Sequence, residues 1–274
     1  MASIAAPARP MRIGMLSTFV ARQPVLAAYG LGLLILAIPL LALQLIDARL
    51  LNGVSVWVKP VKFLVSVGIF ALTAAWFFGY IRPERRKALL PRISIAMLIG
   101  GGSFELVWIC WQASQGLESH FNTGTLFFTL MYALMGLFAV ILVGSTLPLA
   151  WEIGRRPAAG LRPDFVAAVV IGLLLTFMLG GGLGGYMSAQ PGHSVGATGG
   201  HVPLFGWNRS GGDLRIAHFL GIHAQQALPI LAMLTGGLAA TRRWAILAGG
   251  TLAYVGLTLA LFAQAVAGLP LLPL

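Results

Sequence analysis

The sequence has very little charge and almost no cysteine. Only 9% of its 274 residues are charged, whereas 58% are hydrophobic and the mean hydropathy is +0.88. Soluble globular domains carry roughly 25% charged residues, so this composition excludes a soluble domain and indicates an integral membrane protein. Cys110 is the only cysteine, which excludes a disulfide within the chain and a zinc cluster built from thiolates.

Acidic residues are especially scarce. The chain has 7 acidic and 18 basic residues and a net charge of +11. The basic residues lie in short runs between apolar stretches, a pattern typical of residues that orient a membrane protein in its bilayer. We therefore expect the lipid bilayer, and not a nucleic acid, as the partner of this positive charge.

Seven apolar stretches are long enough to cross a bilayer. They cover residues 24–46, 60–81, 93–115, 125–150, 164–186, 215–238 and 244–267. The first 23 residues contain arginines but no apolar core of the length found in signal peptides, so we expect them to form a cytoplasmic arm or an interfacial turn. The sequence predicts an all-α fold, a polytopic membrane helix bundle of seven transmembrane helices in a single domain, residues 1–274.

The basic loops predict the orientation of this bundle. The segments RPERRKALLPR, EIGRRPAAGLRP and TRR follow the second, fourth and sixth stretches, and with the amino-terminal arm they hold 13 of the 18 basic residues. Since basic loops stay in the cytoplasm, we expect a cytoplasmic amino terminus and an external carboxyl terminus.

One long loop and one glycine cluster stand out on the predicted outer side. Residues 187–214 are rich in Gly and Pro and are expected to form an external lid. The run GGGLGG, residues 180–185, would let a neighbouring helix approach closely, as small residues do in membranes. Packing is the favoured role of these glycines.

The ionisable side chains gather toward the same side. Glu105 lies near the middle of the third stretch, and Lys62 shares one face of the second with Lys59, Ser66 and Thr73. We expect Lys62 to reach Glu105, because an acidic group at that depth must be paired or protonated. The pair is interpreted either as a structural ion pair or as a proton relay or ligand site.

The five histidines, His120, His193, His201, His218 and His223, are all expected on the outer face or in the outer half of the membrane. His218 shares a helix face with Gln225, whereas His223 lies about 140° around that helix. His223 and His120 are the candidate ligands of a haem iron or hydrogen-bond partners of a quinone. The alternative for each histidine is a hydrogen bond to a neighbouring carbonyl.

Four motifs resemble those of an uncharacterised family of bacterial multi-pass, seven-helix membrane proteins. They are VKPVKF at 58–63, SHFN at 119–122, GHSVGA at 192–197 and GDLRIAHFLGIHAQQALP at 212–229. The resemblance spans most of the chain and implies a bacterial inner membrane protein. It implies no activity and no catalytic residue.

Three functional hypotheses follow. The first is an outward-facing polar pocket that binds haem b or a quinone, lined by His120, His218, His223, Glu105, Lys62 and Gln225. The second is a non-catalytic accessory subunit of a larger membrane complex, or a pigment- or lipid-binding component, with an aromatic flank formed by Trp76, Phe77, Phe78 and Phe127. The third is a zinc-dependent membrane hydrolase that uses three of the five histidines with Glu118 or Asp213.

Overall fold

The computed structural model describes residues 14–202 and 205–271, and the chain is 72% helical. The helices are α1 (Met15–Arg22), α2 (Pro24–Ile46), α3 (Val58–Phe78), η1 (Pro83–Arg85), α4 (Leu89–Gln115), α5 (Leu126–Gly144), α6 (Thr146–Arg155), α7 (Pro163–Leu175), η2 (Thr176–Gly181), α8 (Gly182–Ser188), α9 (Leu214–Leu234) and α10 (Ala240–Val266). The described residues also form two short antiparallel strand pairs. Strand β1 (Leu50–Leu51) pairs with β2 (Val54–Ser55), and β3 (Ser194–Val195) pairs with β4 (Gly212–Asp213).

Six helical segments are long and apolar enough to cross a membrane. They are α2, α3, α4, the continuous segment of α5 and α6, the continuous segment from α7 to α8, and α10. The 21-residue α9 is of sufficient length, but its arginine, histidines and glutamines keep its hydropathy below that of the other six. The predicted all-α bundle is confirmed, with six candidate membrane spans among the described residues, whereas the seventh span and the sides of the termini stay predictions. The predicted second span begins two residues too late, because Val58 and Lys59 belong to the first turn of α3.

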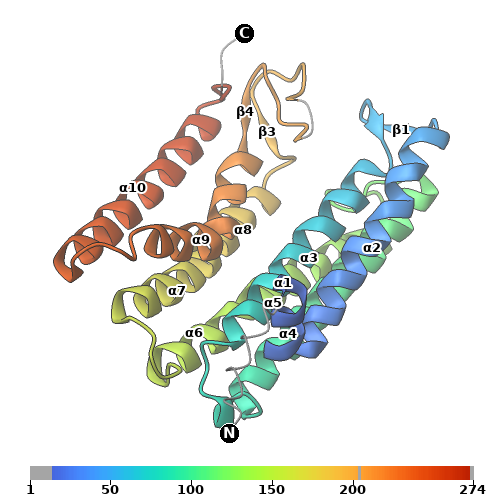
Figure 1. Ribbon diagram of the computed structural model, residues 1–274. Coiled ribbons are helices and arrows are strands. Elements are labelled where there is room, and N and C mark those ends of the chain that lie inside the picture. Colours follow the sequence, from blue (N-terminus) through green and yellow to red (C-terminus); the bar gives the residue numbers. More distant parts are fainter. Residues whose placement is uncertain (1–13, 203–204, 272–274) are drawn as a thin grey trace, which may run out of the picture.

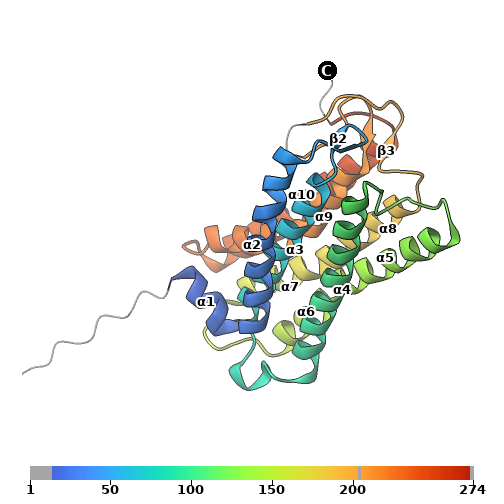
Figure 2. The same ribbon diagram turned by 90° about the vertical axis from the view of Figure 1, so that its right-hand side faces the viewer.

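The helices form two groups (Figure 1). In the first group α3 packs against α2 and α4, and α4 against α5; in the second α9 packs against α7, η2 and α10. Helix α6 contacts both α4 and α7 and so connects the groups, as the view in Figure 2 also shows. The described residues of the predicted lid, 187–202 and 205–214, lie at the same end of the molecule as the β1–β2 hairpin (Figure 1).

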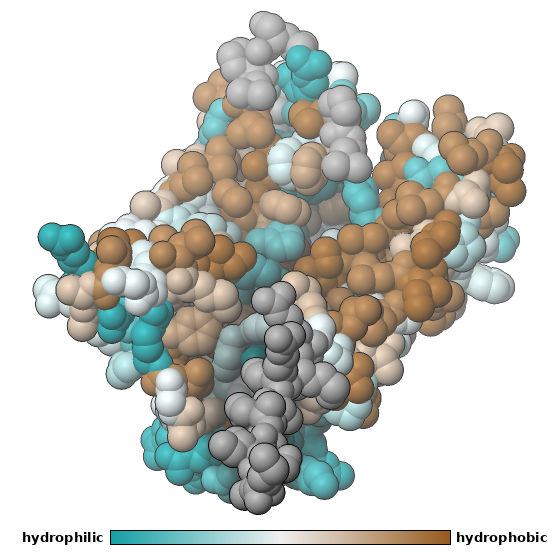
Figure 3. Space-filling view, in the orientation of Figure 1, coloured by the Kyte–Doolittle hydropathy of each residue, from teal (hydrophilic) through white to brown (hydrophobic). Residues whose placement is uncertain are grey.

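The two groups are packed most tightly at the end that carries the basic loops. The main core there contains the fully buried Phe78, Ile81, Leu98 and Leu173. Phe77 and Phe78 therefore belong to the core, and the predicted aromatic flank is wrong for both of them. Toward the lid Figure 3 shows a notch between the lobe that bears the lid and the lobe of α2 and β1. Helix α5 still contacts the second group there, since the Tyr132 hydroxyl donates to the Ser188 carbonyl at 2.8 Å.

The predicted role of the GGGLGG run in close helix packing is confirmed at two of its positions. A Cβ built on Gly180 would lie 2.7 Å from the Ile222 side chain, and one on Gly184 would lie 2.9 Å from the His218 ring. On the opposite helix, a Cβ on Gly221 would lie 2.7 Å from the Gly180 nitrogen. The bare backbone of both helices thus allows α9 to approach η2 and α8 directly.

Candidate functional site

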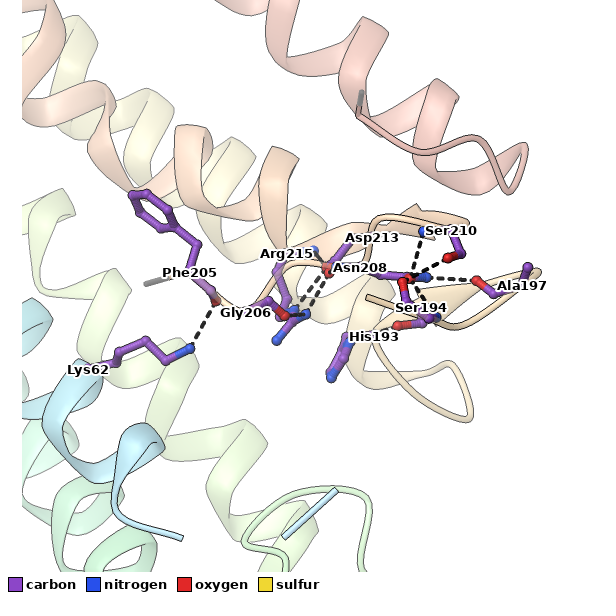
Figure 4. Close-up of polar contacts among 11 residues, drawn as sticks. Lys62, His193, Ser194, Ala197, Phe205, Gly206, Asn208, Ser210, Asp213 and Arg215 are labelled. Carbon is purple, nitrogen blue, oxygen red and sulfur yellow. Dashed lines mark hydrogen bonds and ion pairs between the residues drawn. The ribbon is translucent and has the colours of Figure 1, made fainter. Parts of the chain in front are cut away.

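The lid is held in place at the start of α9. Asp213 is the N-cap of α9 and its carboxylate accepts hydrogen bonds from the Arg215 backbone N–H at 3.0 Å and from the Asn208 N–H at 2.8 Å. The Arg215 side chain forms an ion pair with the same carboxylate and donates to the Gly206 carbonyl (Figure 4). Burial alone would raise the pKa of Asp213, but the hydrogen bonds and charge of Arg215 outweigh it and hold the pKa below its ordinary value.

Lys62 binds the lid and not Glu105. Its ammonium group donates to the Phe205 carbonyl at 3.0 Å, as Figure 4 shows. The prediction that Lys62 reaches Glu105 is therefore wrong. Lys62 instead joins the first helix group to the lid, which belongs to the second.

Lys59 occupies the position that was expected for Lys62. Its Nζ lies 3.0 Å from Nδ1 of His120, and Nε2 of His120 lies 3.8 Å from the Glu105 carboxylate. The Glu105 side chain is only 2% exposed, and its Oε1 has no hydrogen-bond partner among the described residues. Lysine, imidazole and carboxylate thus form one chain of polar groups, in which Lys59, and not the expected Lys62, is the lysine of α3 on the side of Glu105.

The imidazole of His120 is surrounded by groups that disfavour its charged form. Burial, and then the positive charge of Lys59, lower the pKa of His120 to about 3. His193 in the lid is affected in the same way, since burial and the charge of Arg215 lower its pKa to about 4. Both rings are therefore neutral at pH 7 and can accept a proton or a hydrogen bond through one nitrogen.

These lowered pKa values predict a loss of stability in acid. The unfolded chain takes up protons at its histidines near the ordinary pKa of 6.5, whereas folded His120 does so only near 3. The contribution of neutral His120 to the free energy of unfolding is thus fully present above the ordinary pKa of 6.5 and declines as the pH falls below it. Thermal unfolding in detergent, followed by circular dichroism from about pH 7 to about pH 4, should show this decline, and a smaller one in His120→Asn. Parallel curves for the two proteins would contradict the assignment.

The side of α3 that turns toward α9 is exposed in its middle, and the space beside it is called the cleft below. One stripe of α3 contains Lys62, Ser66, Ile69 and Thr73. The ends of this stripe touch the second helix group, because Lys62 binds the lid and Thr73 accepts a hydrogen bond from Gln226 at 3.1 Å. Between them Ser66 is exposed and Ile69 is 41% exposed. The helices therefore meet at both ends of the stripe and leave its middle open.

The α9 side of this cleft carries an aromatic ring, an imidazole and an amide. Phe219, His223 and Gln226 follow helical spacing and are all half-buried. The His223 ring centre lies 4.3 Å from that of Phe219. Phe205 and Trp207 of the lid are stacked with their ring centres 4.5 Å apart, and each lies 5.8 Å from Phe219. These lid rings form an aromatic cover over the outer end of the cleft.

His218 and Gln225 face the opposite direction from His223. Nδ1 of His218 lies 2.9 Å from the Gly180 carbonyl, the structural role considered as the alternative for the histidines. The Gln225 side chain is fully buried, its backbone N–H donates to Thr176 at 3.0 Å, and its amide has no partner among the described residues. Both residues therefore belong to the contact between α9 and η2 and do not line the cleft.

The structure does not bring His120 and His223 to the same depth. The His120 ring lies 6.1 Å from that of Phe63, whereas Gln226, one turn beyond His223, binds Thr73. Thr73 lies about 15 Å deeper along α3 than Phe63, and His223 only about 5 Å above Gln226. The two imidazoles are thus separated by about 10 Å in depth, too far to ligate opposite faces of one haem iron.

The geometry does not favour zinc either. Within residues 14–202 and 205–271, no three His, Cys, Asp or Glu side chains come close enough together to hold a metal ion. The zinc hypothesis required three such ligands. The polar groups that do converge are the Lys59, His120 and Glu105 chain and the cleft between α3 and α9.

Similarity to known proteins gives no independent indication of function. Comparisons of the chain with protein-family models, with curated proteins and with solved structures each returned no match.

Proposed function

We propose that this chain is an integral membrane protein whose cleft between α3 and α9 binds the head ring of a quinone. One observation supports the proposal: Ser66 and Ile69 of α3 are exposed between the two contacts that join this stripe to the second helix group, and His223 lies one turn from Gln226, which makes one of these contacts. A quinone ring is flat and apolar on its faces and accepts hydrogen bonds only at its carbonyl oxygens. The Ser66 hydroxyl and the His223 imidazole are donors at this position.

The position of the cleft between two long helices supports a lipid-soluble ligand. It lies between two helices of membrane-spanning length, so a lipid-soluble molecule could enter from the bilayer. Haem b receives less support, because His120 and His223 lie at different depths. A quinone needs no pair of axial ligands, and His223 alone can donate to one carbonyl.

The proposal includes the topology of the chain. We place α9 as the seventh span, the basic loops and the amino terminus in the cytoplasm, and the lid and the carboxyl terminus outside, in the bacterial inner membrane. The positive charge of the loops supports this orientation. The Lys59, His120 and Glu105 chain would then lie at the outer end of the bundle, where it could exchange protons with the external water.

Quinone content tests the proposal. Protein purified in mild detergent should retain quinone that can be extracted and measured by chromatography, and it should bind a short-chain ubiquinone analogue. In His223→Leu the dissociation constant should rise roughly tenfold, because a hydrogen bond of about 1.4 kcal/mol is lost. His201→Leu is the matched control, since His201 is exposed in the lid outside the cleft. Equal affinity in both variants would refute the assignment of His223.

An accessory subunit is the second candidate, and α5 favours it. In the most apolar 18-residue stretch of the span that contains α5, only 6% of the residues are buried, and Leu126 and Phe127 of α5 are 76% and 59% exposed. A span with so little contact within its own chain has a large face free for another membrane helix. Protein that purifies without quinone but together with a second membrane subunit would establish this role in place of the first.

A further inference from the structure

A cavity at the opposite end of the molecule from the lid is lined mainly by arginine. Arg85, Arg155 and Arg156 surround it together with Glu152, Trp151 and Leu90. It lies where η1 and the start of α4 meet the end of α6. Figure 3 shows hydrophilic surface gathered at this lower end of the molecule.

The charges in this cavity do not cancel. Three guanidinium groups face one carboxylate, so two positive charges remain. The Glu152 side chain is 2% exposed and accepts from Nε of Arg85 at 2.8 Å, whereas Arg156 approaches it only to 3.9 Å. Glu152 therefore holds Arg85 in place and leaves Arg155 and Arg156 largely available to an anion from outside the chain.

The surroundings of these arginines are apolar. Trp151 is 58% exposed, and the Arg155 guanidinium carbon lies 5.1 Å from its ring centre. Leu89, at the start of α4, is 71% exposed. Tryptophan is typical of the membrane interface, where one side of the ring contacts acyl chains and the other contacts polar groups. An anion bound here would thus meet arginines on one side and hydrocarbon on the other.

We infer that this cavity binds the phosphodiester headgroup of an anionic phospholipid. Arg155 and Arg156 donate to the phosphate oxygens in the forked geometry that guanidinium groups provide, and the glycerol and acyl chains follow Trp151 and the exposed Leu89 of α4. Basic pockets between membrane helices suit such headgroups. This site is independent of the proposed quinone cleft, because it lies at the other end of the bundle.

Binding of short-chain lipids to the full-length protein tests this inference. In detergent, dioctanoyl phosphatidylglycerol should raise the thermal unfolding midpoint in a saturable way, whereas dioctanoyl phosphatidylcholine should not. In Arg155→Gln/Arg156→Gln the dissociation constant for phosphatidylglycerol should rise roughly 10- to 30-fold. Both arginines are exposed, so this variant should fold, which circular dichroism and gel filtration will verify.

The control variant removes an equal amount of positive charge, two basic residues, from the same end of the molecule. Lys87→Gln/Arg242→Gln changes two exposed residues that do not line the cavity and should leave the dissociation constant within about twofold. An equal loss in both double variants would overturn the site in favour of a diffuse surface charge. Saturable stabilisation by inorganic phosphate as strong as that by phosphatidylglycerol would overturn the lipid assignment in favour of a free-anion site.

Discussion

Replacing Asp213 by asparagine should lower the free energy of unfolding by about 3 to 5 kcal/mol. The substitution removes the charge that pairs with Arg215 and leaves that guanidinium group partly buried without its partner. Asparagine has one carbonyl oxygen in place of two, so it can accept from the Arg215 N–H at the cap of α9 or from the Asn208 N–H in the lid, but not from both as Asp213 does. Unfolding in detergent by thermal or sodium dodecyl sulfate titration measures the loss, and faster proteolysis within residues 187–214 should accompany it.

The chain supplies a matched control for this prediction. Asp47 pairs with Arg49 at the same two-residue spacing, but that arginine side chain is 49% exposed whereas that of Arg215 is 26% exposed. Because solvent screens the exposed pair, Asp47→Asn should change stability far less. Similar losses in the two variants would mean that burial of the Asp213 pair has no energetic consequence.

The pH dependence of the Asp213 contribution has a definite sign. Its pKa in the folded protein lies below the ordinary value, so the stabilisation is complete above the pKa of the unfolded chain. It disappears as the pH falls through the lower pKa of the folded state. The acid sensitivity of wild type should thus decrease in Asp213→Asn, because that variant has no carboxylate to protonate.

Replacing Gly221 by alanine should destabilise the protein by about 1 to 3 kcal/mol. The new methyl group would lie 2.7 Å from the backbone of Gly180 and Leu179, neither of which can move aside as a side chain would. Helix α9 would have to separate from η2, and the contact between His218 and the Gly180 carbonyl would lengthen. Thermal unfolding in detergent measures the change.

Gly182→Ala is the control and should have the opposite sign. A Cβ at Gly182 would meet no atom within 4 Å. Alanine there gains helix propensity of up to about 1 kcal/mol without a clash. If Gly221→Ala were as stable as Gly182→Ala, the close approach of α9 to η2 would not contribute to stability.

The helices and their apolar character could be predicted because hydropathy is a local property. The transfer free energy of each segment into the membrane depends on its own residues, and the Arg-rich loops between the segments can also be read directly from the sequence. The packing of the GGGLGG run was also predictable, since small residues have few other uses in a span. The polar residues of α9 that suggested a functional site also lower its hydropathy below that of the six candidate spans.

The partners of the polar side chains could not be predicted in the same way. Lys59 and Lys62 lie three residues apart on one face of α3, and their spacing alone does not distinguish which of them reaches Glu105, so the expectation for Lys62 was wrong. Only the path of the loop after α4 places His120 between Lys59 and Glu105. Likewise, nothing local in the sequence shows that Lys62 binds the lid.

The sequence by itself determined that this is a helical chain with segments long and apolar enough to cross a membrane, and which loops between them carry the positive charge. Only the tertiary structure decided that Gln226, one turn from His223, reaches Thr73 of α3 and that His218 lies against the Gly180 carbonyl. The physical reason is the separation along the chain of the residues that determine each feature. Hydropathy and charge act on each segment separately, whereas the cleft depends on contacts such as that of Gln226 with Thr73, between residues far apart in the chain.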